Sequence, residues 1–191
     1  MHMLVAIGAS SGGLEAMMVL LQNLAPSYDL PTVLVLHQRA NRESGVPAML
    51  SRYTHLAVQE PDDKQRIERG HLYVAPPNYH LLVEREKYFG LSVEAPVNFS
   101  RPSIDLLFES AAIAYGSGFI ACILSGANQD GVAGAQAVKQ RRGRVYVQAF
   151  DTAVVSVMPQ AVARSVDVDG TFSPADLATQ LMRLQTTAMA V

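Results

Sequence analysis

The chain has 191 residues, of which 49% are hydrophobic, and its formal net charge is −2. This length and composition can bury a core without covalent staples, so we expect a single domain over residues 1–191. The near-neutral charge and the absence of a long Lys/Arg cluster argue against nucleic-acid binding, and no apolar run is long enough for membrane insertion. One cysteine, Cys122, in an apolar run predicts a buried thiol in a reducing compartment, and hence a cytoplasmic protein.

The first stretch predicts a buried strand, a glycine turn and a helix start. Leu4–Ile7 is apolar, and the segment from Gly8 to Gly12 fits G-x-S-x-G, a spacing that lifts a serine hydroxyl above a sheet. Ser10 is therefore a candidate nucleophile. The backbone N–H groups of such a turn suit either an oxyanion or a phosphate, and glycine-rich turns often do no more than join a strand to a helix. This stretch alone leaves all three interpretations open.

The following segments alternate between strand and helix patterns, except for one region. Apolar periodicity and turn residues predict helices near residues 14–24, 43–53, 102–115, 132–139, 159–164 and 174–184, and strands at 32–36, 56–59, 119–124 and 144–148. Three short β-type runs, at 71–75, 81–84 and 88–93, predict an antiparallel hairpin region outside the core, in which His71 and His80 are structural or solvated and not catalytic. The expected fold class is α/β, a three-layer, doubly wound, mostly parallel sheet with this hairpin region.

Three polar residues follow strands of the predicted sheet. Ser10 follows the first strand, His37 ends the second, and Asp130 follows the strand at 119–124. Because loops at the carboxyl ends of parallel strands share one edge, we expect these side chains to meet there. They have the types needed for nucleophilic acyl chemistry, with Ser10 attacking, His37 taking its proton and Asp130 orienting the imidazole. The chain order Ser, His, Asp differs from that of the α/β-hydrolases.

A set of ordered motifs resembles the catalytic domain of the chemotaxis protein-glutamate methylesterases, the CheB family. The motifs span roughly Val5 to Val168 and comprise 7–13 with Glu15, 36–38, 73–76 with His80, 101–103 with Asp105, 124–131, and Met158-Pro159. The resemblance implies that Ser10, His37 and Asp130 form the triad. It also implies a serine hydrolase that removes γ-glutamyl methyl esters, and deamidates glutamines, on the cytoplasmic helices of chemoreceptors, with no cofactor and no metal.

Some positions depart from the family pattern. Ala127 stands where methionine is common, Gln129 where asparagine is, Ser100 where histidine is, and Val157 where glycine is. The expected oxyanion hole consists of the backbone N–H groups of Ser11 and Ala127, which do not depend on side-chain identity. Relatives usually carry a receiver domain before the catalytic domain. No receiver domain is expected within residues 1–191. Two interpretations stay open: a receiver domain has been removed from this sequence, or the enzyme stands alone and a separate regulatory receiver protein is a partner.

Two alternatives from other classes remain at this point. A Rossmann-type nucleotide-binding oxidoreductase would use the first glycine turn, but Leu14 occupies the place of its third glycine, and His37 that of its ribose-binding acid. A non-catalytic module that docks on receptors would not need the serine, histidine and aspartate to be intact. Measuring turnover separates that alternative from an enzyme.

Overall fold

The computed structural model describes residues 2–37 and 45–189. Within them, seven strands form one sheet in the order β3-β4-β2-β1-β7-β8-β9, with every neighbouring pair parallel. The strands are β1 (Leu4–Ala9), β2 (Thr32–Leu36), β3 (Ala57–Gln59), β4 (His71–Val74), β7 (Phe119–Ile123), β8 (Arg144–Gln148) and β9 (Gly170–Phe172). The doubly wound, mostly parallel sheet predicted from the sequence is confirmed.

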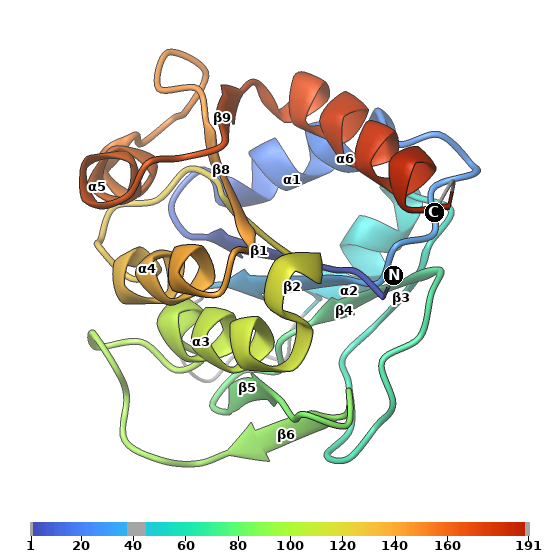
Figure 1. Ribbon diagram of the computed structural model, residues 1–191, viewed down its shortest axis with the longest axis vertical. Helices are drawn as coiled ribbons and strands as arrows, with labels where there is room; N and C mark the ends of the chain where they lie inside the picture. The colour runs from blue at the N-terminus through green and yellow to red at the C-terminus, as the bar shows by residue number, and fades with distance from the viewer. Residues whose placement is uncertain (1, 38–44, 190–191) are drawn as a thin grey trace.

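Helices cover both faces of the sheet (Figure 1). On one face lie α1 (Gly13–Gln22), α2 (Val46–Leu50) and α6 (Pro174–Met189), and on the other α3 (Ile104–Tyr115), α4 (Val132–Gln140) and α5 (Val157–Ser165). Along β1, Val5 and Ile7 pack into the first core, whereas Leu4 and Ala6 pack into the second. This alternation on a strand buried on both faces explains why β1 is apolar throughout.

The hairpin region is partly as predicted. β5 (His80–Val83) and β6 (Phe89–Ser92) form a separate antiparallel sheet, which confirms the prediction for those two runs. The prediction for residues 71–75 is wrong, because His71–Val74 forms β4, a buried strand between β2 and β3 in the parallel sheet. The partners of β4 in β2 lie far away in sequence, so the short run carries no local sign of its parallel pairing.

Smaller differences concern the ends of elements. Of the helix predicted for residues 43–53, positions 43 and 44 lie outside the described residues, and the rest forms α2 followed by a 3₁₀ turn at Ser51–Tyr53. The N-cap of α3 is Ser103, so Pro102 precedes the helix instead of lying in its first turn. The three-residue strand β9 was not predicted.

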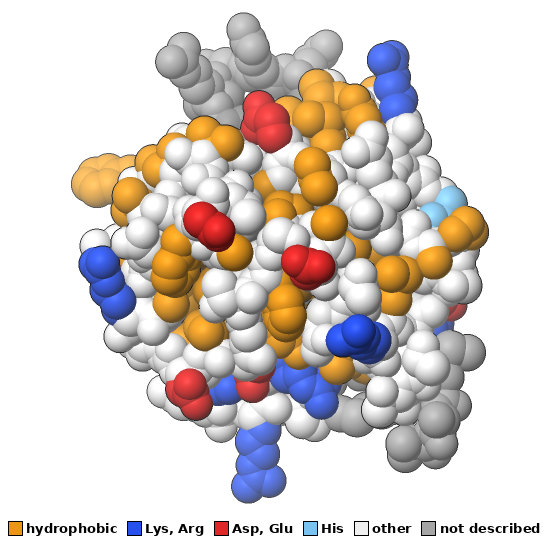
Figure 2. All heavy atoms as spheres, turned by 90° about the horizontal axis from the view of Figure 1, so that it is seen from above, with side chains coloured by type: hydrophobic (Ala, Val, Ile, Leu, Met, Phe, Trp, Pro, Cys, Tyr) orange, Lys and Arg blue, Asp and Glu red, His pale blue; other side chains and the backbone are white. Residues whose placement is uncertain are grey.

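The surface over α1 and α6 is shown in Figure 2. Lys and Arg side chains are scattered there among polar and apolar groups and form no continuous basic patch. Across the part of the chain that the structure describes, no helix is both long enough and apolar enough to span a membrane.

Candidate active site

The site lies at the carboxyl edge of the sheet, where β1 and its two neighbours end. Ala9 and Leu36 are paired in the β1–β2 register, and the His37 N–H donates to the Ala9 carbonyl at 3.0 Å. On the other side of β1, the Ser10 N–H donates to the Ser125 carbonyl at 2.9 Å. Ser10 and His37 therefore leave adjacent strands side by side, while the turn after β7 lies against Ser10.

The turn that carries Ser10 depends on a glycine. Gly12 is the N-cap of α1 and has φ of 75°, in the left-handed region. A Cβ at this position would lie 2.5 Å from Cβ of Val154 and 2.8 Å from Oγ of Ser125, so any larger residue would be both strained and overlapping. Ser10 itself is half-buried, and its hydroxyl has no hydrogen-bond partner among residues 2–37 and 45–189. The hydroxyl is thus presented at the strand end without being committed to another group.

His37 and Asp130 form a hydrogen-bonded pair. The His37 Nε2 lies 2.8 Å from Oδ2 of Asp130, whose side chain is fully buried. Because an ionised carboxylate only accepts hydrogen bonds, Nε2 carries the proton and Nδ1 keeps its lone pair. The Asn128 side-chain amide donates to Nδ1 at 3.2 Å. The imidazole is therefore held at both nitrogens, with Nδ1 as its basic atom.

Asp130 is also bonded to the first turn of α3. It accepts the N–H of Ile104 at 2.8 Å and that of Asp105 at 3.0 Å, and Oγ of Ser103 lies 3.1 Å from its Oδ1. Burial by itself raises the pKa of Asp130, but the hydrogen bonds from His37 and from the two backbone N–H groups outweigh it and lower the pKa. The carboxylate is thus kept ionised opposite the imidazole.

Asp105 caps the neighbouring helix in return. Its carboxylate accepts the N–H groups of Gly131 at 2.9 Å and Gly134 at 2.7 Å, in the first turn of α4, and the side-chain amide of Asn98 at 3.0 Å. Burial raises the pKa of Asp105 to about 6, assisted by the negative charge of Asp130. Asp105 entered the sequence analysis only as a motif residue, and its capping role was not predicted.

Ser125 ties three loops together and was missed by the sequence analysis. Its hydroxyl donates to the Ser11 carbonyl at 2.6 Å and accepts the Val155 N–H at 2.9 Å, while its own N–H donates to Oε1 of Gln148 at 2.8 Å. Ser125 and Gln148 are both buried. The only sequence signal was a serine at the end of an apolar strand, which does not reveal partners from distant loops.

Two backbone donors are available at the same edge. Ser11 and Ala127 are exposed, and among the described residues their N–H groups have no hydrogen-bond partner. Ser11 follows the candidate nucleophile, and Ala127 lies on the turn that contacts it through Ser125. Unpaired N–H groups of this kind can stabilise a developing oxyanion.

A pocket of about 230 Å³ opens beside the imidazole. We call it the Phe99 pocket; it is lined by His37, Asn78, Pro96, Phe99, Ser100, Arg101 and Pro102. Its wall is mixed, with two prolines and a phenylalanine beside polar groups. A substrate group seated here would lie next to the base.

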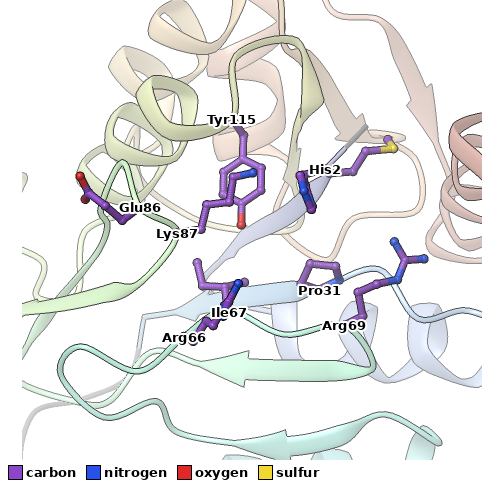
Figure 3. A pocket seen from close by; sticks show the side chains of 9 residues that line it. His2, Pro31, Arg66, Ile67, Arg69, Glu86, Lys87 and Tyr115 are labelled. Atoms are coloured by element: carbon purple, nitrogen blue, oxygen red, sulfur yellow. The ribbon is translucent and has the colours of Figure 1, made fainter. Parts of the chain in front are cut away.

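A second pocket, of about 180 Å³, lies at the opposite edge of the sheet, before β1 and β2 (Figure 3). It is lined by His2, Met3, Pro31, Arg66, Ile67, Arg69, Glu86, Lys87 and Tyr115. Arg69 is paired with Asp29, and burial raises the pKa of the Tyr115 hydroxyl to about 12. The Tyr115 hydroxyl in the second pocket therefore stays protonated near neutral pH.

The sequence profile of the CheB methylesterases matches residues 5–181. The chain belongs to the CheB methylesterase family. The crystal structure of the Thermotoga maritima CheB methylesterase catalytic domain superposes with a TM-score of 0.92 at 29% identity, over 96% of this chain and 99% of that one. Family membership removes the reason for the dinucleotide-binding alternative.

Curated relatives of the CheB family fall into two length classes. A Leptospira interrogans protein, provisionally named protein-glutamate methylesterase/protein-glutamine glutaminase, is 39% identical over 94% of this chain and 93% of its own length. A protein-glutamate methylesterase/protein-glutamine glutaminase of Paramagnetospirillum magneticum is 32% identical over 95% of this chain, and one of Myxococcus xanthus is 35% identical over 93%. The chain spans 49% and 50%, about half, of the latter two.

Two further residues that the sequence analysis considered, His80 and Cys122, are buried in this CheB-family chain. His80 is buried, with Nε2 bonded to the Ala95 carbonyl at 3.1 Å and Nδ1 accepting the Ser103 N–H at 3.2 Å, so of the two predicted alternatives, structural or solvated, it has the structural role. Cys122 is buried in β7, and burial raises its pKa. Among the described residues, no three His, Cys, Asp or Glu side chains are grouped to hold a metal ion.

Proposed function

We propose that this chain is a serine hydrolase that demethylates γ-glutamyl methyl esters, and deamidates glutamines, on the cytoplasmic helices of chemoreceptors. The single observation that carries the proposal is the pair formed by His37 and Asp130, whose geometry leaves a lone pair on Nδ1 at the strand end next to Ser10. The relatives described above are named for these two activities and support the choice of substrate. Residues 1–191 act as one catalytic domain.

The catalytic cycle follows from the positions of the three side chains. Ser10 attacks the γ-carbonyl carbon while His37 Nδ1 takes its proton, and Asp130 stabilises the imidazolium through Nε2. Collapse of the tetrahedral intermediate breaks the C–O bond to the methyl group's oxygen, and His37 returns the proton so that methanol leaves. Water, activated by the same base, then releases glutamate from the acyl-enzyme. With glutamine as the substrate, the leaving group is ammonia.

Two further features take part in this cycle. The N–H groups of Ser11 and Ala127 donate to the oxyanion of the intermediate. Asn128 donates to Nδ1 before substrate binds, so this hydrogen bond is exchanged for one from Ser10 when the reaction begins. The resting geometry therefore orients the imidazole ring without a hydrogen bond between Ser10 and His37. In many enzymes the catalytic hydrogen bonds form fully only when substrate binds.

We propose that the enzyme works in the cytoplasm, where the receptor helices are exposed, without inserting into the membrane. A regulatory receiver protein is a second proposed partner. The partner in catalysis is the receptor itself, and neither nucleic acid nor a cofactor is needed for the steps above.

The test is methanol release from methylated chemoreceptor membranes. Ser10→Ala should lower turnover by roughly 10⁴ to 10⁶-fold, because it removes the nucleophile. Ser11→Ala is the matched control: it changes the adjacent, exposed serine but keeps its backbone N–H, and turnover should stay within about tenfold of wild type. Near-normal release by Ser10→Ala would exclude Ser10 from the mechanism, and no release by the wild-type chain would favour the docking alternative.

A further inference from the structure

A single phenylalanine is fully exposed at the mouth of the candidate active site. Phe99 has the most exposed of the large hydrophobic side chains among the described residues, and it lines the same pocket as His37. Exposed apolar side chains are common on protein surfaces and need no explanation when they are isolated. Phe99 differs because it stands in the wall of a pocket that also contains the proposed base.

The loop that carries Phe99 is held in place by many hydrogen bonds. Val97 and Ser100 exchange backbone hydrogen bonds of 3.1 and 2.8 Å across it. The Asn98 amide donates to Oδ2 of Asp105 at 3.0 Å, and the Arg101 guanidinium donates to the carbonyls of residues 93 and 94, both at 2.8 Å. The exposure of Phe99 is therefore a property of an ordered loop.

The backbone at this point is also unusual. Asn98 has φ of 48° and Phe99 has φ of 62°, both in the left-handed region. Asparagine tolerates this conformation, but a bulky residue such as phenylalanine adopts it only at a cost. This backbone conformation is unfavourable for Phe99 and leaves its ring exposed to water, so it does not stabilise the isolated fold. Backbone strain of this kind is typical of ligand-binding sites.

The position of the pocket relative to the base limits what can occupy it. Because His37 is in its wall, a group bound there lies beside the proposed base. On a helical substrate, the side chains nearest to the reacting residue are those three or four positions away. Within this mixed wall, Pro96, Phe99 and Pro102 provide an apolar contact surface on which an apolar side chain can pack, beside the polar groups of Asn78, Ser100 and Arg101.

We propose that the Phe99 pocket is a recognition subsite for an apolar side chain of the substrate helix, three or four positions from the glutamate that is demethylated. This assignment rests on the proposed function and specifies its substrate: an amphipathic helix whose apolar residue precedes or follows the ester by one turn. Phe99 is the specificity-determining residue, because its ring packs on that side chain when the helix binds.

The experiment compares two substrates. One is an amphipathic helical peptide with a single γ-glutamyl methyl ester and leucines one turn before and after it; the other is the γ-methyl ester of a blocked single glutamate. Phe99→Ala should raise KM for the peptide by about tenfold and leave its kcat unchanged, because uniform binding is lost. The small ester has no neighbouring side chain, so its kcat/KM should not change. Phe99→Leu should recover most of the affinity for the peptide.

Two controls keep the result specific. Ile113→Ala removes another exposed apolar side chain, near the far end of α3, and should leave both substrates unaffected. Replacing both leucines of the peptide by alanine should raise KM as much as Phe99→Ala does, and combining the two changes should add little more, as expected for residues in contact.

The outcomes separate the two claims. Equal losses on both substrates, or no loss on either, would overturn the assignment of Phe99 while leaving the hydrolase intact. Additive effects of Phe99→Ala and the leucine replacements would also overturn it. If the wild-type chain hydrolysed neither ester, the proposed function would be wrong, and the assignment of the subsite would be wrong with it.

Discussion

The first turns of α3 and α4 cap each other reciprocally. Each is capped by a buried aspartate from the other: Asp130, just before α4, accepts N–H groups of α3, and Asp105, in α3, accepts N–H groups of α4. The side-chain donors around the two carboxylates differ. Asp130 also accepts a hydrogen bond from His37, whereas Asp105 accepts one from the Asn98 amide.

That difference separates two roles for the same side chain. An imidazole and two backbone N–H groups lower the pKa of Asp130, while burial next to that charge raises the pKa of Asp105 to about 6. Both carboxylates stabilise helix ends, but only one can stabilise a positive charge on a base. Helix capping therefore does not identify the catalytic aspartate of this region. The hydrogen bond with His37 identifies it.

The largest expected effect is on the catalytic side of the pair. Asp130→Asn should lower kcat for methanol release by about 10⁴-fold, because an amide facing Nε2 favours the tautomer that has its proton on Nδ1. Asp105→Asn, which keeps an acceptor for α4, should change kcat far less. Single-turnover assays of the two variants provide the comparison, and equal losses would show that capping, not contact with His37, is what turnover requires.

Removing the structural carboxylate should act mainly on stability. Asp105→Ala leaves the N–H groups of Gly131 and Gly134 buried without an acceptor, and we expect the free energy of unfolding to fall by on the order of 3 to 5 kcal/mol. Urea unfolding measures the loss. Asp151→Ala, at an exposed aspartate, is the control and should change stability by less than about 0.5 kcal/mol.

The two carboxylates should also give stability opposite pH dependences. Asp105 titrates near 6 when folded and near about 3.9 when unfolded, so the folded state binds more protons between these values. Its contribution to the free energy of unfolding should therefore fall as the pH rises from about 4 to about 6, by on the order of 2 to 3 kcal/mol. The contribution of Asp130, whose pKa is lowered, is present above about 3.9 and is lost as the pH falls below that value.

Urea unfolding between about pH 4 and pH 7 tests this sign. Asp105→Asn should remove the decrease expected for the wild-type chain, because the amide does not titrate in this range. If the wild-type chain and Asp105→Asn had parallel stability curves across the interval, the raised pKa of Asp105 would be wrong.

The smallest effect concerns the other nitrogen of the imidazole. Asn128→Ala removes the donor to Nδ1 and the acceptor that Asn128 provides for the Asp130 N–H, and kcat should fall by about tenfold as the ring loses orientation. Unfolding free energy should change by about 1 kcal/mol or less. A rise in kcat would instead mean that the amide obstructs the base.

Much of the site could be predicted because it follows strands that are easy to recognise. The apolar runs that become β1, β2 and β7 are continuous, so the positions of Ser10, His37 and Asp130 at one edge followed from the rule for parallel sheets. The same reasoning failed for His71–Val74, because a four-residue run looks alike in a hairpin and in a parallel sheet.

The supporting contacts could not be predicted from local pattern. Ser125 bonds to Ser11, 114 positions away, and Asp105 bonds to Gly134, 29 positions away. Such pairs leave no periodicity and no spacing in the sequence, since they depend on how helices and loops pack. Asn128 was visible only as a polar residue in a turn, and nothing in the sequence placed its amide on the imidazole.

The reciprocal capping has an evolutionary consequence. Replacing either aspartate leaves N–H groups on one helix without an acceptor and changes the surroundings of the other carboxylate. The two positions are therefore constrained to change together. Ser10 is under no such structural constraint, because its hydroxyl contributes nothing to the packing of α3 and α4. A descendant of this chain that had lost the enzyme activity should therefore first lose its serine and keep both aspartates. Retention of that pair in a relative would report the ancestry of the fold, not the survival of its chemistry.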